Sequence, residues 1–240
     1  MSLIELDGVG RTVLLPDGDR LEILRDVTLT IEVGEHVSIV GRSGSGKSTL
    51  LNLMGLLDTP TEGEYLLQDR PTRGLSQRQR AKLRGAGFGF VFQQFNLLPG
   101  RTALQNVAAP LLYSGGRDFW RRNRLAADML ERVGLGERAG TMPEKLSGGE
   151  QQRVAIARSL IRSPRVILCD EPTGALDVQT GTEIMDLLDT VAAESGATLV
   201  TITHDTMVAA RAHRHYRLDA GLLGPLDPAT LPAPRPVVAS

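Results

Sequence analysis

The pattern of hydrophobic positions divides the chain into short apolar runs separated by longer segments with helical spacing. Apolar runs of strand length are found at residues 36–40, 88–92, 166–169 and 199–202. Helical patterns are found after residue 49, at about 76–84, 103–113 and 118–133, after residue 147, and at about 179–194. Strands that are separated by helices predict an α/β domain with a mostly parallel core sheet.

The two ends of the chain have a different pattern. Residues 3–33 combine alternating apolar positions with a strong turn signal from Pro16 to Asp19, which predicts a small antiparallel sheet. Residues 56–75 contain further turn signals. Residues 224–240 are rich in proline and have no periodicity, so a loose, flexible tail is expected there.

Composition limits the possible classes of protein. The chain has 240 residues and a formal net charge of −1, which gives no reason to expect bulk affinity for nucleic acid. The single cysteine, Cys169, lies in an apolar run and is expected to be a buried thiol. Glu5 and Asp7 interrupt any apolar leader, and no apolar run approaches the roughly 20 residues that span a bilayer. We therefore expect a cytosolic protein that would need another chain to act in a membrane.

Residues 41–49 read G-R-S-G-S-G-K-S-T and match the phosphate-binding loop pattern G-x-x-x-x-G-K-[ST]. The apolar run before them and the leucines after them supply the strand and the helix that this motif needs. Glycines allow a tight turn, and backbone N–H groups at a helix start then point at an anion. Lys47 is placed to bind the terminal phosphates and Ser48 to ligate Mg2+. The expected nucleotide-binding residues here are Gly41, Arg42, Ser43, Gly44, Ser45, Gly46, Lys47, Ser48 and Thr49.

Polar residues follow three of the predicted strands. Asp170 and Glu171 come directly after residues 166–169, where nucleotide hydrolases hold Mg2+, so we interpret Asp170 as a residue of the metal's outer sphere and Glu171 as the general base. The alternative is a carboxylate pair that caps a turn. Gln93 is placed to reach Mg2+ or the attacking water, and His204 to orient that water, although a lone histidine is usually structural.

These residues together resemble the ATP-binding subunits of ABC transporters, over nearly the whole chain to about residue 223. In this resemblance Gln93 is the Q-loop, residues 146–151 (L-S-G-G-E-Q) are the ABC signature, and residues 167–171 are the Walker B strand. Residues 175–177 are the D-loop and His204 is the switch histidine. The resemblance implies the P-loop ABC ATPase fold over residues 1–223, with an N-terminal antiparallel β-subdomain and an inserted helical subdomain at about 94–160.

The resemblance also implies a mechanism that one chain cannot complete. Two copies would pack head to tail around two ATP molecules, with Mg2+ as cofactor and with Ser48, Gln93 and Asp170 as its ligands. The phosphate loop of one copy would face Ser147, Gly148 and Gly149 of the other, and Asp177 would also lie near nucleotide. ATP would close this homodimer, hydrolysis would open it, and separate transmembrane permease subunits would use the motion. Catalysis is expected from Glu171, His204 and Gln93.

Several stretches resemble the branch of lipoprotein-release, macrolide-efflux and cell-division ATPases. They are residues 43–52, 55–58, 89–93, 95–99, 102–107 and 171–174. The segment after Gln93 is expected to dock a short permease helix through Phe95, Leu97 and Leu98, although a core role for these three is nearly as well supported. Where family members stack adenine on an aromatic side chain, this chain has Val13, which predicts weaker or less selective adenine binding.

The leading hypothesis is therefore the ATPase subunit of an exporter-type membrane transporter, on the cytoplasmic face of the membrane. An ATPase that drives a signalling or cell-wall-remodelling complex without moving a solute is the main alternative. Soluble ABC ATPases of DNA repair have a long coiled coil, and those of translation have two such domains, neither of which is evident here. A pure binding module would have no need of Glu171 and His204.

Overall fold

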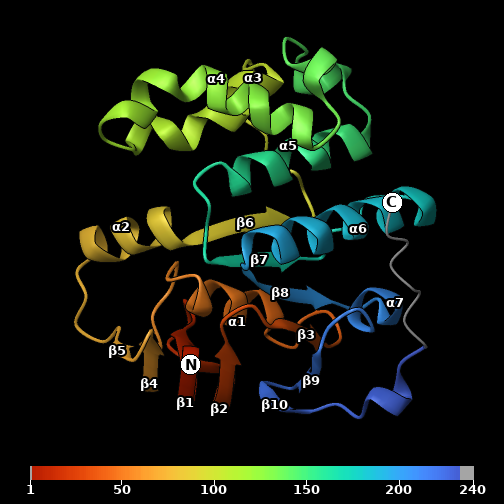
Figure 1. Ribbon diagram of the computed structural model, residues 1–240. Coiled ribbons are helices and arrows are strands. Elements are labelled where there is room, and N and C mark those ends of the chain that lie inside the picture. Colours follow the sequence, from red (N-terminus) through yellow and green to blue (C-terminus); the bar gives the residue numbers. More distant parts are fainter. Residues whose placement is uncertain (1, 233–240) are drawn as a thin grey trace. The chain divides into compact units, whose positions relative to one another are not determined.

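The structure is a computed structural model that describes residues 2–232 in two compact units (Figure 1). The first unit contains the residues up to 84 together with those from 198 onward, and the second contains residues 85–197. In the residues described, no helix combines the length and the apolar character needed to cross a membrane.

The first unit contains the predicted antiparallel sheet, with strand order β2-β1-β4-β5. β1 (Ser2–Leu14) pairs with β2 (Arg20–Glu32) and with β4 (Glu62–Leu67), which pairs with β5 (Arg70–Pro71). The sequence indicated only turns where β4 and β5 lie. These strands are mostly exposed and polar, and Gly63, at φ 75°, approaches the Gly8 carbonyl so closely that a Cβ would lie 2.2 Å from it.

The first unit also contains parallel strands. β3 (His36–Val40) lies between β8 (Thr198–Thr203) and β9 (Arg214–Asp219) and is parallel to both. β10 (Leu222–Pro225) pairs antiparallel with β9. The helices that accompany these strands are α1 (Lys47–Met54), α2 (Gln77–Gly87) and α7 (Thr206–Ala209).

The first residues of the predicted tail, from 224 onward, have regular structure, although the sequence predicted a loose segment there. β10 continues to Pro225, the Leu226 N–H donates to the His215 carbonyl, and a 3-10 turn, η4 (Pro228–Thr230), follows. The sequence did not predict β9 and β10 because β9 consists largely of polar residues and β10 of only four residues. Residues 233–240 of the predicted tail lie outside the described residues.

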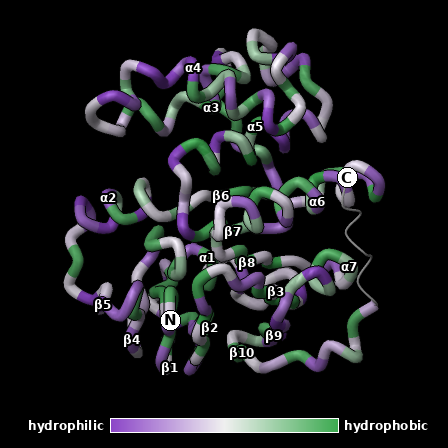
Figure 2. The backbone as a smooth tube through the Cα atoms, in the orientation of Figure 1, coloured by the Kyte–Doolittle hydropathy of each residue, from purple (hydrophilic) through white to green (hydrophobic). Residues whose placement is uncertain are grey.

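The second unit has a parallel pair of strands and a group of helices. β6 (Phe88–Phe92) pairs with β7 (Val166–Asp170), and Figure 2 shows the apolar character of both. The helices and 3-10 turns are α3 (Ala103–Ala108), η1 (Ala109–Tyr113), α4 (Arg117–Arg132), η2 (Gly136–Arg138), η3 (Pro143–Lys145), α5 (Gly148–Leu160) and α6 (Val178–Ser195). The helix expected at 103–113 changes to a 3-10 turn at Ala109, next to Pro110, which has no N–H to donate.

Three of these helices share a hydrophobic core. α3, α4 and α5, which lie together at the top of Figure 1, contribute buried residues to it that include Val107, Ala126, Leu130 and Val154. Several members of this core are alanines, which allow the helix backbones to approach closely. This packing holds α5 in place within the second unit. The L-S-G-G-E-Q segment forms the N-terminal end of this helix.

A buried tyrosine in the first unit provides a test of this packing. Tyr65 is 1% exposed, and its hydroxyl donates to the Met54 carbonyl at 2.6 Å. Replacing Tyr65 by Phe leaves that buried carbonyl without its donor, so we expect a loss of about 1–3 kcal/mol in the free energy of unfolding, measured by urea titration. The control is Tyr113→Phe, at a side chain that is 86% exposed. Equal effects of the two substitutions would contradict the structural role of the Tyr65 hydroxyl.

Candidate functional site

The loop between β3 and α1 is shaped by glycines, either because a Cβ would clash or because the backbone has a positive φ. A Cβ on Gly41 would lie 2.4 Å from the Leu218 carbonyl oxygen and 2.7 Å from the Ser45 Oγ. Gly44 and Gly46 have φ values of 79° and 101°, in the region that favours glycine. The loop therefore winds tightly before α1.

This loop offers donors and a cation to an anionic ligand. Lys47 is 8% exposed, and its Nζ donates to the carbonyls of Gly41 at 2.8 Å and Arg42 at 2.9 Å. Within the described chain, α1 has neither a side-chain cap nor an acidic residue in its first turn. The buried Ser45 Oγ has no hydrogen-bond partner among the described residues. Open N–H groups at a helix start, beside a lysine, fit a phosphate group well.

The register of the parallel strands brings His204 to the same edge as this loop. Val40, the last residue of β3, is paired with Thr203, the last residue of β8. Gly41 and His204 therefore directly follow the ends of adjacent strands. His204 is exposed and immediately precedes the short segment that leads to α7. The structure thus brings together two of the site elements that the sequence predicted, the phosphate loop and His204.

The second unit repeats this arrangement with Gln93 and Glu171. Phe92, the last residue of β6, is paired with Asp170, the last residue of β7. Gln93 and Glu171 therefore directly follow the ends of the two strands. Glu171 has a left-handed backbone, with φ 50°, and its carbonyl accepts the Gly174 N–H at 3.0 Å. The Gln93 side chain lies against Gly174, where a Cβ would be 2.9 Å from Nε2. Asp170, Glu171 and Gln93 therefore meet at one edge of the β6–β7 pair.

Ser147 caps α5 in a way that keeps a donor available. The Ser147 Oγ accepts the Glu150 N–H at 3.3 Å, and the Glu150 carboxylate accepts the Ser147 N–H at 2.8 Å. Because the Ser147 oxygen is the acceptor in this capping box, its own O–H proton remains free to donate elsewhere. Ser147 is exposed, and the N–H groups of the helix start that follows it point outward from α5.

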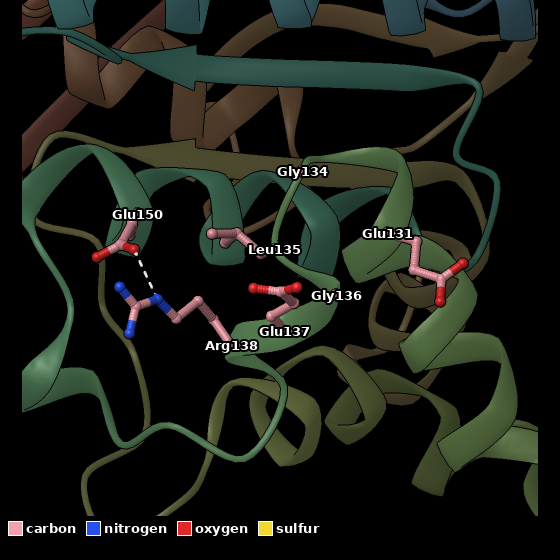
Figure 3. Close-up of a pocket in the computed structure, with 7 residues that line it drawn as sticks. All are labelled: Glu131, Gly134, Leu135, Gly136, Glu137, Arg138 and Glu150. Atoms are coloured by element: carbon pink, nitrogen blue, oxygen red, sulfur yellow. Dashed lines mark ion pairs between the residues drawn. The ribbon is translucent and has the colours of Figure 1, made fainter.

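Arg138 holds the other oxygen of Glu150. Its Nε lies 3.2 Å from the Glu150 Oε1, and Figure 3 shows this ion pair at the side of a pocket. The residues that line the pocket are Glu131, Gly134, Leu135, Gly136, Glu137, Arg138 and Glu150. The Ser147 N–H above all, with Arg138 adding to it, lowers the pKa of the Glu150 carboxyl, so Glu150 stays ionised in the capping box.

Asp177 is the N-cap of α6. Its Oδ1 accepts the Thr180 N–H at 3.0 Å and its Oδ2 accepts the Thr180 hydroxyl at 2.6 Å. These bonds, the Thr180 side-chain bond first, lower the pKa of the Asp177 carboxyl. The same Thr180 approaches the signature segment, since a Cβ on Gly149 would lie 2.5 Å from its Cγ2. The starts of α5 and α6 therefore touch at Gly149.

Two side chains that the sequence did not assign to the site hold its loops. The Gln152 Nε2 donates to the Pro172 carbonyl at 2.6 Å, in the loop after Glu171. The Arg158 guanidinium donates to the carbonyls of Phe95 at 3.0 Å and Asn96 at 2.6 Å, in the segment after Gln93. Their signal in the sequence was weak: both are polar side chains among the core-side positions of α5.

The remaining predicted residues have different environments. Val13 is half-buried on β1, opposite Leu21 of β2. Leu97 packs against the core of α3, α4 and α5, whereas Leu98 is 44% exposed. Cys169 is fully buried, as expected, and burial raises the pKa of its thiol.

Comparisons with known proteins agree with this geometry. The family model of the ABC transporter matches residues 24–174. The chain is 50% identical over 220 residues, 91% of this chain and 32% of the relative, to the macrolide export ATP-binding/permease protein MacB 1/2 of Paracoccus denitrificans. It is 48% identical over 221 residues, 92% of this chain and 33% of the relative, to the pyoverdine export ATP-binding/permease protein PvdT of Pseudomonas syringae pv. tomato.

Among solved structures, the chain resembles a dimeric post-hydrolysis state of the ATP-binding cassette MJ0796 bound to ADP and Pi. The TM-score is 0.84 and the identity 43%, over 93% of this chain and 99% of that one.

The phosphate loop and the strand-end carboxylates, on this fold, define a P-loop ATPase domain. The chain belongs to the ABC transporter family, as its sequence predicted, and it resembles the export branch of that family. It spans about a third of the length of the curated relatives that it matches.

The contact between the starts of α5 and α6 can be tested by a rescue experiment. Gly149→Ala introduces a methyl group against the stiff Thr180 side chain, so we expect a loss of about 1–3 kcal/mol in the free energy of unfolding and reduced ATPase activity. Thr180→Ser removes the Cγ2 methyl and keeps the hydroxyl bonded to Asp177. The double variant should recover most of the stability, measured by denaturant titration. Simple additivity of the two losses would contradict the contact.

Proposed function

We propose that the chain is the nucleotide-binding subunit of an exporter-type ABC transporter, and that ATP-driven closure of its homodimer powers a separate transmembrane permease. The observation that carries this proposal is the exposed capping box at Ser147. It presents a hydroxyl proton and helix-start N–H groups on a surface where the described residues of the second unit bring no phosphate loop. The phosphate donors that α5 offers fit a half-site that a second copy completes.

Binding of the nucleotide begins with the phosphate loop. The N–H groups of the loop and of α1 bind the phosphates, Lys47 neutralises their charge, and the Ser45 hydroxyl is a further donor. For Mg2+, the candidates are the Ser48 hydroxyl, the Asp170 carboxylate and the Gln93 amide oxygen, all of the oxygen type that Mg2+ prefers. Bound Mg2+ would neutralise charge that develops on the phosphates.

Hydrolysis then needs a group that removes a proton from water. Glu171 directly follows β7 on a left-handed backbone that the Gly174 N–H supports, which makes it the best candidate for the general base. Gln93, beside it at the same strand edge, would position the attacking water or the metal. His204, at the edge that carries the phosphate loop, would contact the γ-phosphate.

Closure of the dimer would follow from the phosphate donors at the start of α5. Ser147, Gly148 and Gly149 of one copy would bind the γ-phosphate held by the phosphate loop of the other. Because both contacts involve the same phosphate, ATP favours the closed dimer and its hydrolysis weakens it. The permease would contact Phe95 and the exposed Leu98. Both lie in the segment whose backbone carbonyls accept hydrogen bonds from Arg158. The similarity to macrolide and pyoverdine export proteins supports export over a complex that moves no solute.

The role of Glu171 is tested by Glu171→Gln. This change keeps the size of the side chain and removes the base, so we expect the hydrolysis rate to fall by about 10²–10⁴ while ATP still binds and a closed dimer accumulates. Steady-state phosphate release and size-exclusion chromatography with ATP and Mg2+ measure the two effects. The control is Glu64→Gln on exposed β4. Hydrolysis at the parental rate would remove Glu171 from the base role.

The half-site at Ser147 is tested against a matched capping box. Ser147→Ala and Thr102→Ala each remove a box, the first from α5 and the second from α3. Each should cost about 1 kcal/mol of stability. Only Ser147→Ala should also lower hydrolysis and dimer formation, with nucleotide binding by the monomer unchanged. Loss of monomer binding would place Ser147 in the pocket of its own copy. An equal loss of activity in Thr102→Ala would assign the effect to stability.

A further inference from the structure

The first half of α4 carries arginines and a tryptophan on one exposed face. Arg117, Trp120, Arg121 and Arg124 are spaced by three and four residues, so they share a face of the helix, and all four are exposed. The opposite face contributes Ala126 and Leu130 to the core with α3 and α5. The exposed side of α4 is therefore a surface that the packing of its own unit does not require.

The aromatic part of this surface is large and held in place. Trp120, the only tryptophan of the chain, is 81% exposed. Its ring is nearly perpendicular to that of Phe119, with the ring centres 5.2 Å apart. The Arg122 guanidinium lies 4.7 Å from the centre of the Phe119 ring and donates to the Phe119 carbonyl. Tyr113, at the end of η1, which contacts α4, is 86% exposed. Two amphipathic rings at one corner of the unit thus face solvent.

The arginines of this face form no ion pairs in the part of the chain that the structure describes. Among the described residues, no ion pair involves Arg117, Arg121 or Arg124, whereas Arg132 at the other end of α4 pairs with Glu194. Arginines four residues apart repel each other, and cations near a helix N-terminus interact unfavourably with the helix dipole. Asp118 is the sole acidic residue in the first turn. An external anionic surface would relieve both effects.

We propose that this aromatic–arginine face of α4, formed by Arg117, Trp120, Arg121 and Arg124 with Tyr113 beside it, docks on anionic lipid headgroups. Tryptophan and tyrosine rings prefer the interface between water and hydrocarbon, and basic residues on a helix are attracted by the negative potential of anionic lipids. The face combines both properties. This inference goes beyond the proposed function, because it assigns the chain a lipid contact of its own in addition to the permease.

The single tryptophan makes the test direct. The full chain is mixed with vesicles of phosphatidylcholine alone or with phosphatidylglycerol added. The emission of Trp120 should shift to shorter wavelength only with the anionic vesicles, and added salt should reverse the shift because it screens the attraction. No shift, or an equal shift with neutral vesicles, overturns the proposal. If the Trp120 emission shifts with neither kind of vesicle, a protein partner becomes the occupant to test for this face.

Matched variants distinguish vesicle binding by this face from binding by positive charge elsewhere on the chain. Arg121→Gln with Arg124→Gln should weaken partition onto anionic vesicles by roughly 25-fold, about fivefold for each arginine. Arg73→Gln with Arg78→Gln removes the same charge from exposed positions of the first unit and should have a much smaller effect. Trp120→Ala, followed by vesicle flotation, should also weaken binding. ATPase activity and thermal unfolding confirm that each variant is folded. Equal losses in the two double variants overturn the proposal.

Discussion

The alignment of parallel strands is the constraint on which the rest of this structure depends. Val40 is paired with Thr203 in one unit and Phe92 with Asp170 in the other. Each pair is followed by the polar residues that the proposed chemistry uses. Because side chains alternate between the two faces of a strand, a slip of one residue would move buried apolar side chains to the wrong face. The same apolar packing that stabilises the strands therefore sets the positions of the polar groups at their ends.

α5 connects the second unit's separate polar loops. Ser147 caps its N-terminus, Gln152 holds the loop after Glu171, and Arg158 holds the segment after Gln93. These bonds end on backbone carbonyls, so they fix the course of each loop and not only one side chain. A ligand that pulls on the start of α5 would thus act on both loops through one rigid helix. This is a physical route by which the proposed nucleotide contacts at Ser147 and the proposed permease contacts near Phe95 would influence each other.

The sequence predicted those parts of the structure whose signal is local. The parallel strands at 36–40, 88–92 and 166–169 are largely buried and mostly apolar, and the phosphate loop is a contiguous motif. β4, β5, β9 and β10 were missed because they are short or polar and are strands only through their neighbours. Arg138, Gln152 and Arg158 were missed as site residues for a related reason, since their partners lie between 12 and 63 positions away in the chain.

The caps of α1, in the first unit, and of α5 and α6, in the second, differ in what they leave for a ligand. α1 has no side-chain cap, so its donors remain for the phosphates. Ser147 caps α5 through its oxygen and keeps its proton. Asp177 caps α6 through both carboxylate oxygens, which receive the Thr180 N–H and hydroxyl. Asp177 was expected to lie near nucleotide; because an ionised carboxylate would repel phosphate, we propose that it acts there by positioning its neighbours. It orients Thr180, and Thr180 in turn contacts Gly149, at the start of α5 where the proposed phosphate donors lie.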